Sequence, residues 1–470
     1  MFSHPIPTPE ELLSHSRFLI LGGGTSGVSA SKLLLSLGRE TILVDKNPPQ
    51  GNEKDYSKVF AESDGEKAVS LSDFLIKSPG ISPNHPILNL AQQKGIPVLS
   101  EIALGRVFYK GLLVGITGTD GKSTTTALTY HILKSEYSNS RIGGNIGVPF
   151  TSFCRENLNL VVLELSSYQL EDSPDLSVDV SAILNLAPDH LERHVSMENY
   201  ARAKWKIISS NPKAHVFLNR KVLDYISAET FSDTVCHKHF VGEAGGVLIE
   251  EEGLKISSPK YQYNLTKFPL KGKHNHMNLC FAIGIAETLG MAPSSIEAAY
   301  ESFEGLKFRF EKMKFPNVEK DFENFTFIND SKSTNLHSLL SGLSGFKKGD
   351  SVYLILGGIP KEEPLDPLLN KLKELQICVW VYGTAVSKWK EELSKLDLPI
   401  FFLENLGQTI SHLKTYLIEE GGRMFHVSGS KRDGTILFSP ACASFDQYKN
   451  FEERGRDFEK KISDSFSELN

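Results

Sequence analysis

The sequence predicts an α/β protein of three domains, each built around a mostly parallel sheet. Short apolar runs alternate with helical stretches in three successive parts of the chain, and many of these runs end in a glycine-rich or polar turn. At 470 residues the chain is too long for one hydrophobic core and long enough for about three domains. Changes of composition predict that the domains span residues 1–101, 102–306 and 307–470.

Composition and charge indicate a soluble globular protein. Apolar residues make up 40% of the chain and charged residues 23%, which are ordinary values. The net charge of −6 argues against a nucleic-acid partner, because such proteins normally carry a basic surface. The five cysteines are scattered without a CxxC pair, and no signal peptide or membrane-spanning run is evident. We therefore expect a cytoplasmic monomer, without a membrane partner, that holds anionic substrates with local cations and helix termini.

The first domain begins with a glycine-rich turn between a strand and a helix. The apolar run RFLIL leads directly into GGGTSG, in which Gly22, Gly24 and Gly27 have GxGxxG spacing. A second apolar run ends at Asp45, the position of the acidic residue in Rossmann-like dinucleotide-binding domains. The pattern fits a nicotinamide or flavin site, the diphosphate of another nucleotide, or only a tight turn. Ser78, in SPGI after another predicted strand, indicates a second loop on the same sheet edge.

The second domain opens with the most informative stretch, GITGTDGKSTT at 115–125, between an apolar run and a helical stretch. Its glycines allow the backbone to wrap an anion closely, and N–H groups at a helix start attract negative charge. Lys122 would neutralise the outer phosphates, and the hydroxyl of Ser123 or Thr124 would bind Mg²⁺. Ile116 replaces the first glycine of GxxxxGK[ST], so the pattern is the narrower GxxGxxGK[ST]T. The alternative is a turn beside a surface lysine, but the context favours a P-loop-type nucleotide site.

Further polar residues follow the predicted strands of this central domain. RIGGNIGVP is predicted to be a glycine-rich loop that presents Asn145, and Glu164 follows the apolar run LVVL. Asp189 and His190 follow the next predicted strand, at 180–185. An acid after a parallel strand, beside a phosphate loop, is suited to Mg²⁺, and His190 becomes a second candidate metal ligand. The alternatives are a helix N-terminal acid for Glu164 and a satisfied loop histidine for His190.

Lys204 lies in a predicted helix that Ser196 caps. One apolar stripe, at positions i, i+4, i+7 and i+8, contains Tyr200, Lys204, Ile207 and Ile208. A lysine within such a stripe must extend to solvent, pair with another group, or lose its charge. Extension to solvent is the usual outcome, so spacing alone does not make Lys204 functional.

The rest of the chain predicts a small insertion and another α/β domain. Short antiparallel strands are expected within 240–270, followed by a helix and a hinge at GLKFRFE. The apolar runs FTFIND, VYLILGG, ICVWVYG, PIFFL and TILFS then predict a second Rossmann-like sheet. Its strand ends deliver the polar segments 330–335, 357–361 and 439–455.

Several motifs in one order resemble a known family, the ATP-dependent Mur ligases of bacterial cell-wall synthesis. They are the phosphate loop, GGNIGVP, ELSSYQLE, DH, the helical AK, HNHMN, the arginine after FEGL, and NDSKSTN. They extend over nearly the whole chain, and together they are far more specific than GxGxxG alone. SPACASFDQYKNFEERG, with GGGTSG and SPGI at the front, is most similar to the members that add D-glutamate.

The resemblance implies roles for individual residues, and it assigns UDP rather than a nicotinamide cofactor to the first domain. The residues implied to bind the UDP-sugar are Gly24, Thr25, Ser26, Lys46, Asn47, Ser78, Asn145 and Gln169. Those implied to bind ATP are Gly118, Thr119, Asp120, Gly121, Lys122, Ser123, Thr124, Asn275, Arg309, Asp330 and Lys332. Those implied to bind D-glutamate are Thr334, Lys361, Ser444, Phe445 and Phe451. The implied catalytic residues are Lys122, His190 and Lys204, and the implied metal ligands are Ser123, Glu164, His190 and Lys204.

This chain also departs from the family pattern. Lys46 and Asn47 differ from the residue types usual at those uridine contacts. Asp120 stands where asparagine is often found, and Phe308 stands where histidine is common.

The resemblance implies a reaction in the cytoplasmic stage of peptidoglycan biosynthesis, with ATP and Mg²⁺ as cofactors. The alanyl carboxylate of UDP-N-acetylmuramoyl-L-alanine would be joined to the amine of D-glutamate through an acyl phosphate. The family lysine that matches Lys204 carries a carbamate, which would turn a cation in an apolar stripe into an anionic metal ligand. No histidine or carboxylate need act as nucleophile.

Three alternatives stay open at this point. Another Mur ligase or a folylpolyglutamate synthetase would share the ATP site, although SPACASFDQY argues against both. An NAD-dependent oxidoreductase would explain the first glycine turn but not GKSTT. A nucleotide-regulated binding protein would explain GKSTT but not the later motifs.

Overall fold

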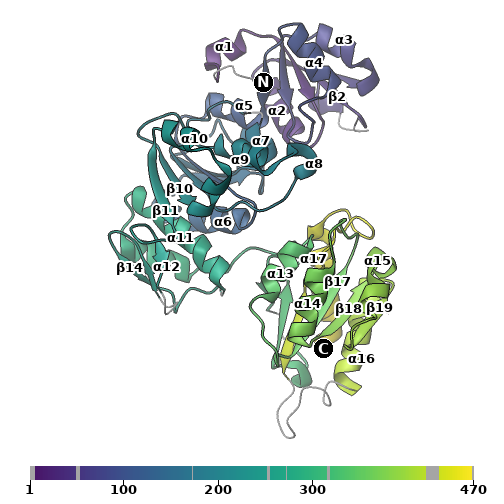
Figure 1. Ribbon diagram of the computed structural model, residues 1–470. Coiled ribbons are helices and arrows are strands. Elements are labelled where there is room, and N and C mark those ends of the chain that lie inside the picture. Colours follow the sequence, from purple (N-terminus) through teal and green to yellow (C-terminus); the bar gives the residue numbers. More distant parts are fainter. Residues whose placement is uncertain are drawn as a thin grey trace. The chain divides into compact units, whose positions relative to one another are not determined.

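The computed structural model describes residues 6–48, 53–171, 173–250, 255–270, 272–314, 318–419 and 433–467. The chain forms two compact units, Met1–Glu304 and Gly305–Asn470, and each is described by itself (Figure 1). The first unit contains two parallel sheets and a small antiparallel one, and the second unit contains one mostly parallel sheet. The predicted α/β class is therefore confirmed, while the exact boundaries of the three predicted domains stay a prediction.

The first sheet has the strand order β3-β2-β1-β4-β5 and is parallel throughout. Its strands are β1 (Arg17–Leu21), β2 (Glu40–Asp45), β3 (Lys58–Ala61), β4 (Phe74–Lys77) and β5 (Val98–Ser100). Its helices are α1 (Pro9–Leu13), α2 (Thr25–Ser36), α3 (Gly65–Ser70), α4 (Pro86–Gln93) and α5 (Glu101–Phe108). The strand order reverses between β1 and β4, and such a reversal is where open α/β sheets bind ligands. The turn after β1 and the loop after β4 therefore share one sheet edge, as predicted.

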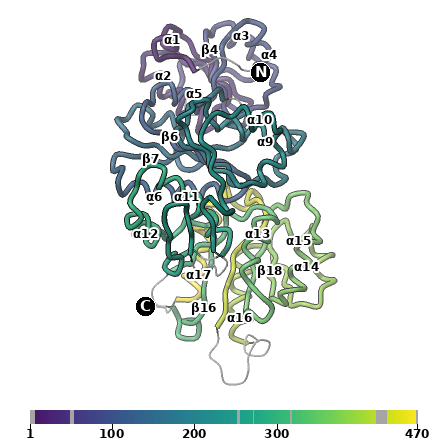
Figure 2. Tube along the Cα trace, turned by 60° about the vertical axis from the view of Figure 1, so that its left-hand side comes forward, coloured from purple at the N-terminus to yellow at the C-terminus, as the bar shows by residue number. Residues whose placement is uncertain are grey.

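The second sheet has the order β11-β10-β9-β6-β8-β7 and is also parallel. Its strands are β6 (Leu112–Thr117), β7 (Ser140–Gly144), β8 (Leu160–Glu164), β9 (Val180–Ile183), β10 (His215–Asn219) and β11 (His237–Val241). Its helices are α6 (Lys122–Leu133), α7 (Ser167–Glu171), α8 (Leu191–His194), α9 (Met197–Trp205), α10 (Ala228–Asp233), α11 (Lys273–Thr288) and α12 (Pro293–Glu301). Helices α6, α11 and α12 pack against one another, as both Figure 1 and Figure 2 show. Because β6 lies between β8 and β9, the ends of these three strands meet beside the phosphate loop.

Two expectations for this sheet were wrong in detail. RIGGNIGVP is not a loop throughout, because Ser140–Gly144 forms strand β7 and pairs with β8 in spite of its glycines. The predicted helix from Ser196 ends at Trp205, since the N–H groups of Ile207 and Ile208 bond to carbonyls only three residues back. Such tight turns close a helix rather than extend it. Tyr200 and Lys204 still share one helix face.

The small antiparallel sheet consists of β12 (Leu248–Ile249), β13 (Lys255–Ser257) and β14 (Gln262–Asn264). It confirms the antiparallel strands predicted within 240–270.

The second unit contains a sheet of order β15-β16-β20-β17-β18-β19, in which only the pairing of β15 with β16 is antiparallel. Its strands are β15 (Glu311–Lys312), β16 (Phe325–Asn329), β17 (Val352–Gly357), β18 (Cys378–Tyr382), β19 (Ile400–Leu403) and β20 (Gly434–Phe438). Its helices are α13 (Leu336–Leu343), α14 (Asp366–Leu375), α15 (Thr384–Leu393), α16 (Leu406–Glu419) and α17 (Phe451–Phe466). Leucine-rich and aromatic-rich clusters of buried side chains form the core of this unit. All five strands predicted for this part are present.

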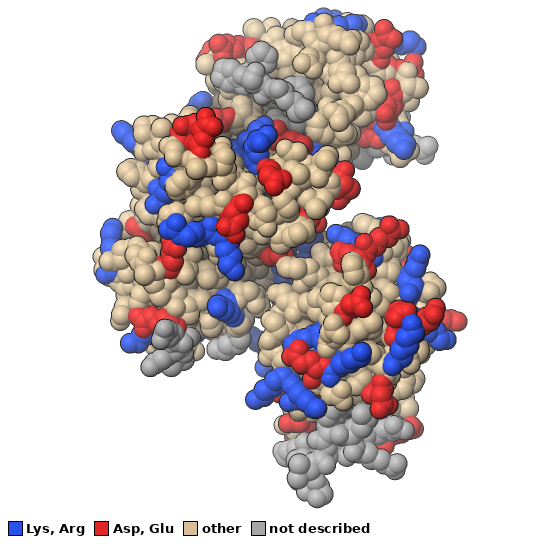
Figure 3. Space-filling view, in the orientation of Figure 1, with Lys and Arg blue, Asp and Glu red and all other residues tan. Residues whose placement is uncertain are grey.

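On the face in view, neither acidic nor basic side chains gather into one large patch (Figure 3). Acidic and basic side chains lie interspersed over the described part of each unit (Figure 3). No helix within the described residues is both long and apolar enough to span a membrane.

Candidate functional site

The loop between β6 and α6 is tight, and one of its glycines is required sterically. Gly121 has a φ of +77°, which side chains disfavour. A Cβ at this position would also lie 2.5 Å from Oδ1 of Asn278 on α11. Helix α6 begins immediately afterwards at Lys122, and the first N–H groups of a helix have no earlier carbonyl to bind. The loop therefore has the geometry of an anion-binding helix start.

Asn185, two residues beyond β9, holds this loop from the side. Its Oδ1 accepts hydrogen bonds from the N–H groups of Thr119 (3.2 Å) and Asp120 (2.9 Å). Its Nδ2 donates to the carbonyl of Asp120 at 3.0 Å. The Thr119 hydroxyl adds a second attachment, because it accepts from the N–H of Ala187 at 3.0 Å and lies 3.2 Å from the Tyr200 hydroxyl.

Two lysines bind the carbonyl groups of the same loop. The Nζ of Lys122 donates to the carbonyls of Gly118 (2.9 Å) and Thr119 (2.6 Å). The Nζ of Lys204 donates to the Gly118 carbonyl at 2.7 Å and lies 4.6 Å from the centre of the Tyr200 ring. Lys122 and Lys204 therefore approach one carbonyl from two different helices.

Lys204 is almost completely buried, with 1% of its surface exposed. It does not extend to solvent, so the usual outcome for such a lysine does not apply here. Burial, and next the positive charge of Lys122, lower the pKa of Lys204 well below its ordinary value. The structure therefore favours a neutral amine at this position.

Glu164 is the last residue of β8 and is 2% exposed, so it is not a helix N-terminal acid. Its Oε1 accepts a hydrogen bond from Nδ2 of Asn145 at 2.6 Å, and the Asn145 N–H donates to the Glu164 carbonyl. Its Oε2 is buried without a hydrogen-bond partner among the described residues. A buried carboxylate oxygen without a donor is costly, and a cation would remove that cost.

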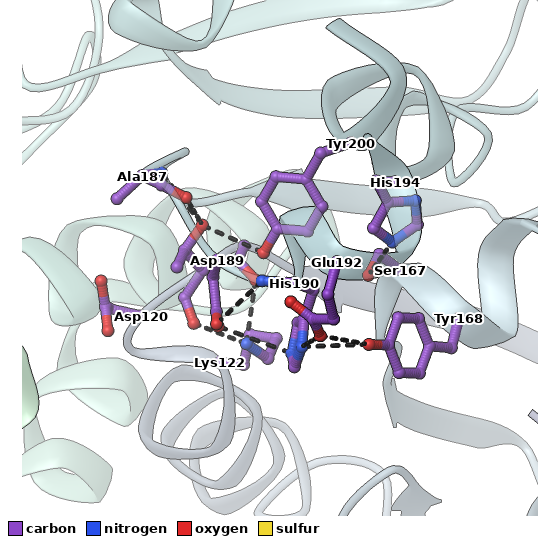
Figure 4. Close-up of polar contacts among 12 residues, drawn as sticks. Asp120, Lys122, Ser167, Tyr168, Ala187, Asp189, His190, Glu192, His194 and Tyr200 are labelled. Carbon is purple, nitrogen blue, oxygen red and sulfur yellow. Dashed lines mark hydrogen bonds and ion pairs between the residues drawn. The ribbon is translucent and has the colours of Figure 1, made fainter. Parts of the chain in front are cut away.

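His190 is the N-cap of the short helix α8, with a φ of +54°, and lies among acidic and phenolic groups (Figure 4). Its Nδ1 lies 3.1 Å from the Tyr168 hydroxyl and 3.5 Å from Oε1 of Glu192, and its Nε2 lies 3.5 Å from Oδ2 of Asp189. No group of three or more His, Cys, Asp or Glu side chains in the described ranges is arranged to hold a metal ion.

Two other residues implied for this unit are also placed. Gln169, on α7, is 5% exposed, and its Oε1 accepts hydrogen bonds from the N–H and hydroxyl of Ser166. Asn275 lies in the first turn of α11. Their roles toward the UDP-sugar and ATP stay predictions.

The first glycine turn, after β1, is also built for close approach. A Cβ at Gly27 would lie 2.0 Å from the Gly22 carbonyl, so α2 can meet the turn only without a side chain there. The Gly23 N–H donates to Oδ2 of Asp45 at 2.6 Å. The Ser78 hydroxyl donates to the Gly22 carbonyl at 2.8 Å and ties in the loop after β4.

The other residues implied to contact UDP surround this turn. Gly24 is the N-cap of α2, Thr25 and Ser26 form its first turn, and Lys46 and Asn47 lie exposed after β2.

In the second unit, Asp330 follows β16 and is held by two donors. Its Oδ2 accepts from the Ser439 hydroxyl at 2.8 Å, and its Oδ1 accepts from the Phe310 N–H at 3.0 Å. Burial nevertheless raises the pKa of Asp330 to about 7. Lys332 lies nearby, with its Nζ 4.2 Å from the centre of the Phe451 ring.

The residues implied to hold D-glutamate differ in exposure. Ser444 is buried and Thr334 is half-buried, whereas Lys361 is exposed and Phe445 is 71% exposed. Phe451 begins α17, and Arg309 is half-buried in the segment before β15. Their roles stay predictions.

Arg454, which sequence reasoning missed, connects three strand ends of this unit. It is 0% exposed, and its guanidinium donates to the carbonyls of Gly357, Cys442 and Ser331 at 3.2, 2.9 and 2.8 Å. These carbonyls lie beyond or at the ends of β17, β20 and β16. The sequence signal that could have drawn attention to Arg454 was its place in the quoted FEERG motif.

Comparisons with known proteins agree with this geometry. Residues 116–286 match the family model described as "Mur ligase middle domain". A UDP-N-acetylmuramoylalanine--D-glutamate ligase of Leptospira interrogans is 42% identical, over 98% of this chain and 99% of its own length. Proteins of the same name from Leptospira borgpetersenii and Elusimicrobium minutum are 44% and 33% identical, over 97% and 94% of this chain and 97% and 96% of their own lengths.

Solved structures support the fold. The UDP-N-acetylmuramate-alanine ligase MurC of Thermotoga maritima aligns with a TM-score of 0.57 and 18% identity, covering 96% of this chain and all of that one. MurF of Acinetobacter baumannii aligns with a TM-score of 0.58 and 17% identity, covering 95% and 90%. On the strength of the relatives that match along its whole length, the chain belongs to the Mur ligase family.

Proposed function

We propose that this chain is the ATP-dependent ligase that joins D-glutamate to UDP-N-acetylmuramoyl-L-alanine in peptidoglycan biosynthesis. The proposed use of ATP is supported by the phosphate loop, which is held between Asn185 and two lysines beside the buried Glu164. The choice of substrates rests on relatives of that name at 42–44% identity along nearly the whole chain.

The reaction requires that a poor acyl donor be activated. A carboxylate oxygen of the alanyl group bonds to the γ-phosphorus of ATP, the bond from that phosphorus to the β–γ bridging oxygen breaks, and ADP leaves. The amine of D-glutamate then attacks the acyl carbon, loses a proton, and expels phosphate. Both steps gather negative charge, so fixed positive groups contribute most where that charge develops. Lys122, which here binds carbonyls of its own loop, is the residue proposed to turn toward the phosphates.

Oxygen donors at the end of β8 and in the first turn of α6 fit Mg²⁺. The unpartnered Oε2 of Glu164 and the hydroxyl of Ser123 are oxygen donors of the kind that Mg²⁺ prefers. When bound with ATP, the ion would neutralise charge on the phosphates.

A second cation near His190 would need one more anionic ligand, and Lys204 can supply it as a carbamate. Carbamate formation joins a neutral amine to CO₂ with loss of one proton, and burial favours that neutral amine. Lys204→Ala should lose activity and regain part of it with added acetate, measured as phosphate release. Lys206→Ala, two residues away and partly exposed to solvent, is the matched control and should stay active. Failure of rescue together with unchanged metal affinity would leave Lys204 only a packing role.

The remaining assignments are proposals of the same kind. Gly24, Thr25, Ser26 and Ser78 would hold the UDP-sugar, and Lys361 would meet the side-chain carboxylate of D-glutamate. We further place the enzyme in the cytoplasm as a monomer, with small molecules as its only substrates.

Substrate-dependent ADP formation tests the proposal directly. Purified protein with ATP and Mg²⁺ should form ADP only when both UDP-N-acetylmuramoyl-L-alanine and an amino acid are present. D-Glutamate should be the preferred amino acid among D-glutamate, L-alanine, L-lysine and diaminopimelate. Preference for any other of these would overturn the substrate assignment while leaving the ATP site in place.

A further inference from the structure

We propose that Asn185 is a positioning residue for the nucleotide. Its side-chain amide fixes the Asp120 peptide and so holds the phosphate loop in the conformation described above. The proposal rests on the proposed use of ATP and adds a residue to it. Asn185 follows β9, which pairs with β6, the strand that leads into the loop. Its contacts to the loop join residues 65 and 66 positions apart in the sequence.

The three hydrogen bonds require an amide. Oδ1 accepts from the N–H groups of Thr119 and Asp120, while Nδ2 donates to the Asp120 carbonyl. One side chain thus satisfies both polar groups of a single residue. A carboxylate of the same shape can accept the first two bonds but cannot donate the third. The amide is also neutral, so it adds no repulsion beside bound phosphates.

The lysines on the carbonyl side cannot hold the loop in the same way. Lys122 binds the carbonyls of Gly118 and Thr119, and a bound phosphate would share the same ammonium group. Lys204 reaches only the Gly118 carbonyl. The Asn185 contacts do not depend on a cation that the phosphates would share. They therefore support the loop independently of Lys122.

Binding of MgADP tests this inference, with UDP-N-acetylmuramoyl-L-alanine as the internal reference. Asn185→Ala should weaken ADP binding in calorimetry and raise the ATP KM, each by about 10-fold or more, since small displacements of a positioning loop are costly. The affinity for the UDP-sugar in the same sample should stay within about two-fold of wild type. A purely structural role would lower both affinities together with the melting temperature.

Asn219 provides a matched control from the neighbouring strand. It ends β10 at the same sheet edge, but its Oδ1 accepts from the Lys221 N–H at 3.1 Å, so its contact is local and does not reach the phosphate loop. Asn219→Ala should change stability slightly and leave ADP and UDP-sugar affinity within about two-fold of wild type.

Asn185→Asp separates the hydrogen-bond donor from the shape of the side chain and keeps both acceptor bonds for folding. At pH 8 the introduced carboxylate cannot donate and repels phosphates, so ADP binding should fall as in Asn185→Ala. At pH 5 its protonated fraction can donate to the Asp120 carbonyl, so ADP affinity relative to wild type should partly recover.

Two results would overturn the inference. One is an ADP affinity within two-fold of wild type in Asn185→Ala. The other is parallel loss of ADP and UDP-sugar affinity in both Asn185 variants. If the wild-type protein bound ADP but did not ligate D-glutamate, only the proposed substrates would fail, because the ADP comparison needs no turnover.

Discussion

The first unit contains two glycine turns of the same kind, each between a buried parallel strand and a helix, and different side chains hold their backbones. The turn after β1 has a carboxylate already in place, because Asp45 accepts the Gly23 N–H. The loop after β6 is held instead by a neutral amide and carries two lysines on its carbonyls. A turn that already faces an anion gains less from a phosphate, whereas the second loop is suited to a triphosphate. In the function proposed above, the neighbouring side chains, more than the glycine spacing, distinguish the two turns.

Lys122→Ala should have the largest effect on activity, and it tests whether the loop after β6 acts separately from the turn after β1. ATP-dependent phosphate release should fall by about 10³-fold, because removal of one group that stabilises developing charge typically costs 10²–10³-fold or more. Affinity for the UDP-sugar, measured by calorimetry, should stay unchanged because the first turn lies on a different sheet. Lys134→Ala, at the exposed far end of α6, is the control. Equal losses of both affinities would show that the two turns do not act separately.

Asp45→Ala tests the turn after β1, and we expect an effect of intermediate size. Its carboxylate also accepts the Asn47 N–H at 2.8 Å, so its loss should loosen the turn around the proposed uridine contacts. We expect the KM for the UDP-sugar to rise by about 10-fold and the ATP KM to stay within two-fold, in steady-state kinetics with each substrate varied. A raised ATP KM with an unchanged KM for the UDP-sugar would contradict the proposal that the two turns bind different substrates.

Glu101→Gln would have the smallest effect and concerns how the two sheets are joined. The fully buried Glu101, at the start of α5, accepts the N–H and hydroxyl of Thr151, and that hydroxyl also bonds to Ser29 on α2. Burial raises the pKa of Glu101 from 4.5 to about 7. The folded protein therefore binds more protons than the unfolded chain between these values. Stability should fall as the pH rises from about 4.5 to 7, by roughly 3 kcal/mol at most.

The measurement is the free energy of unfolding against pH. Glu101→Gln keeps the acceptor for Thr151 and cannot ionise, so its profile should lack this slope, although the buried amide adds a constant cost. Glu66→Gln, at an exposed position of α3, should keep the wild-type profile. A slope that persists in Glu101→Gln would assign the effect to other groups.

The strands and both glycine turns could be predicted because their signals are local. The runs before Gly22 and Gly118 are apolar on both faces, and such runs are buried as parallel strands. Asn185 and Arg454 could not be predicted in the same way, since each bonds to backbone groups distant in sequence, at a distance of 65 residues for Asp120 and 123 for Ser331. β7 was missed because its glycines look like a turn, and only pairing with β8 makes them a strand. The burial of Lys204 was likewise invisible, because periodicity shows which face a side chain lies on but not what covers that face.

The buried guanidinium of Arg454 links three strand ends of the second unit at a place that solvent does not reach. Ions in solution screen a charged group much less where water cannot reach it. The positions of the strand ends that bear Ser331, Gly357 and Cys442 should therefore be indifferent to ionic strength. Lys361, in contrast, is exposed and fully open to screening. If Lys361 binds the amino acid as proposed, added salt should weaken amino-acid affinity in the wild type more than in Lys361→Ala.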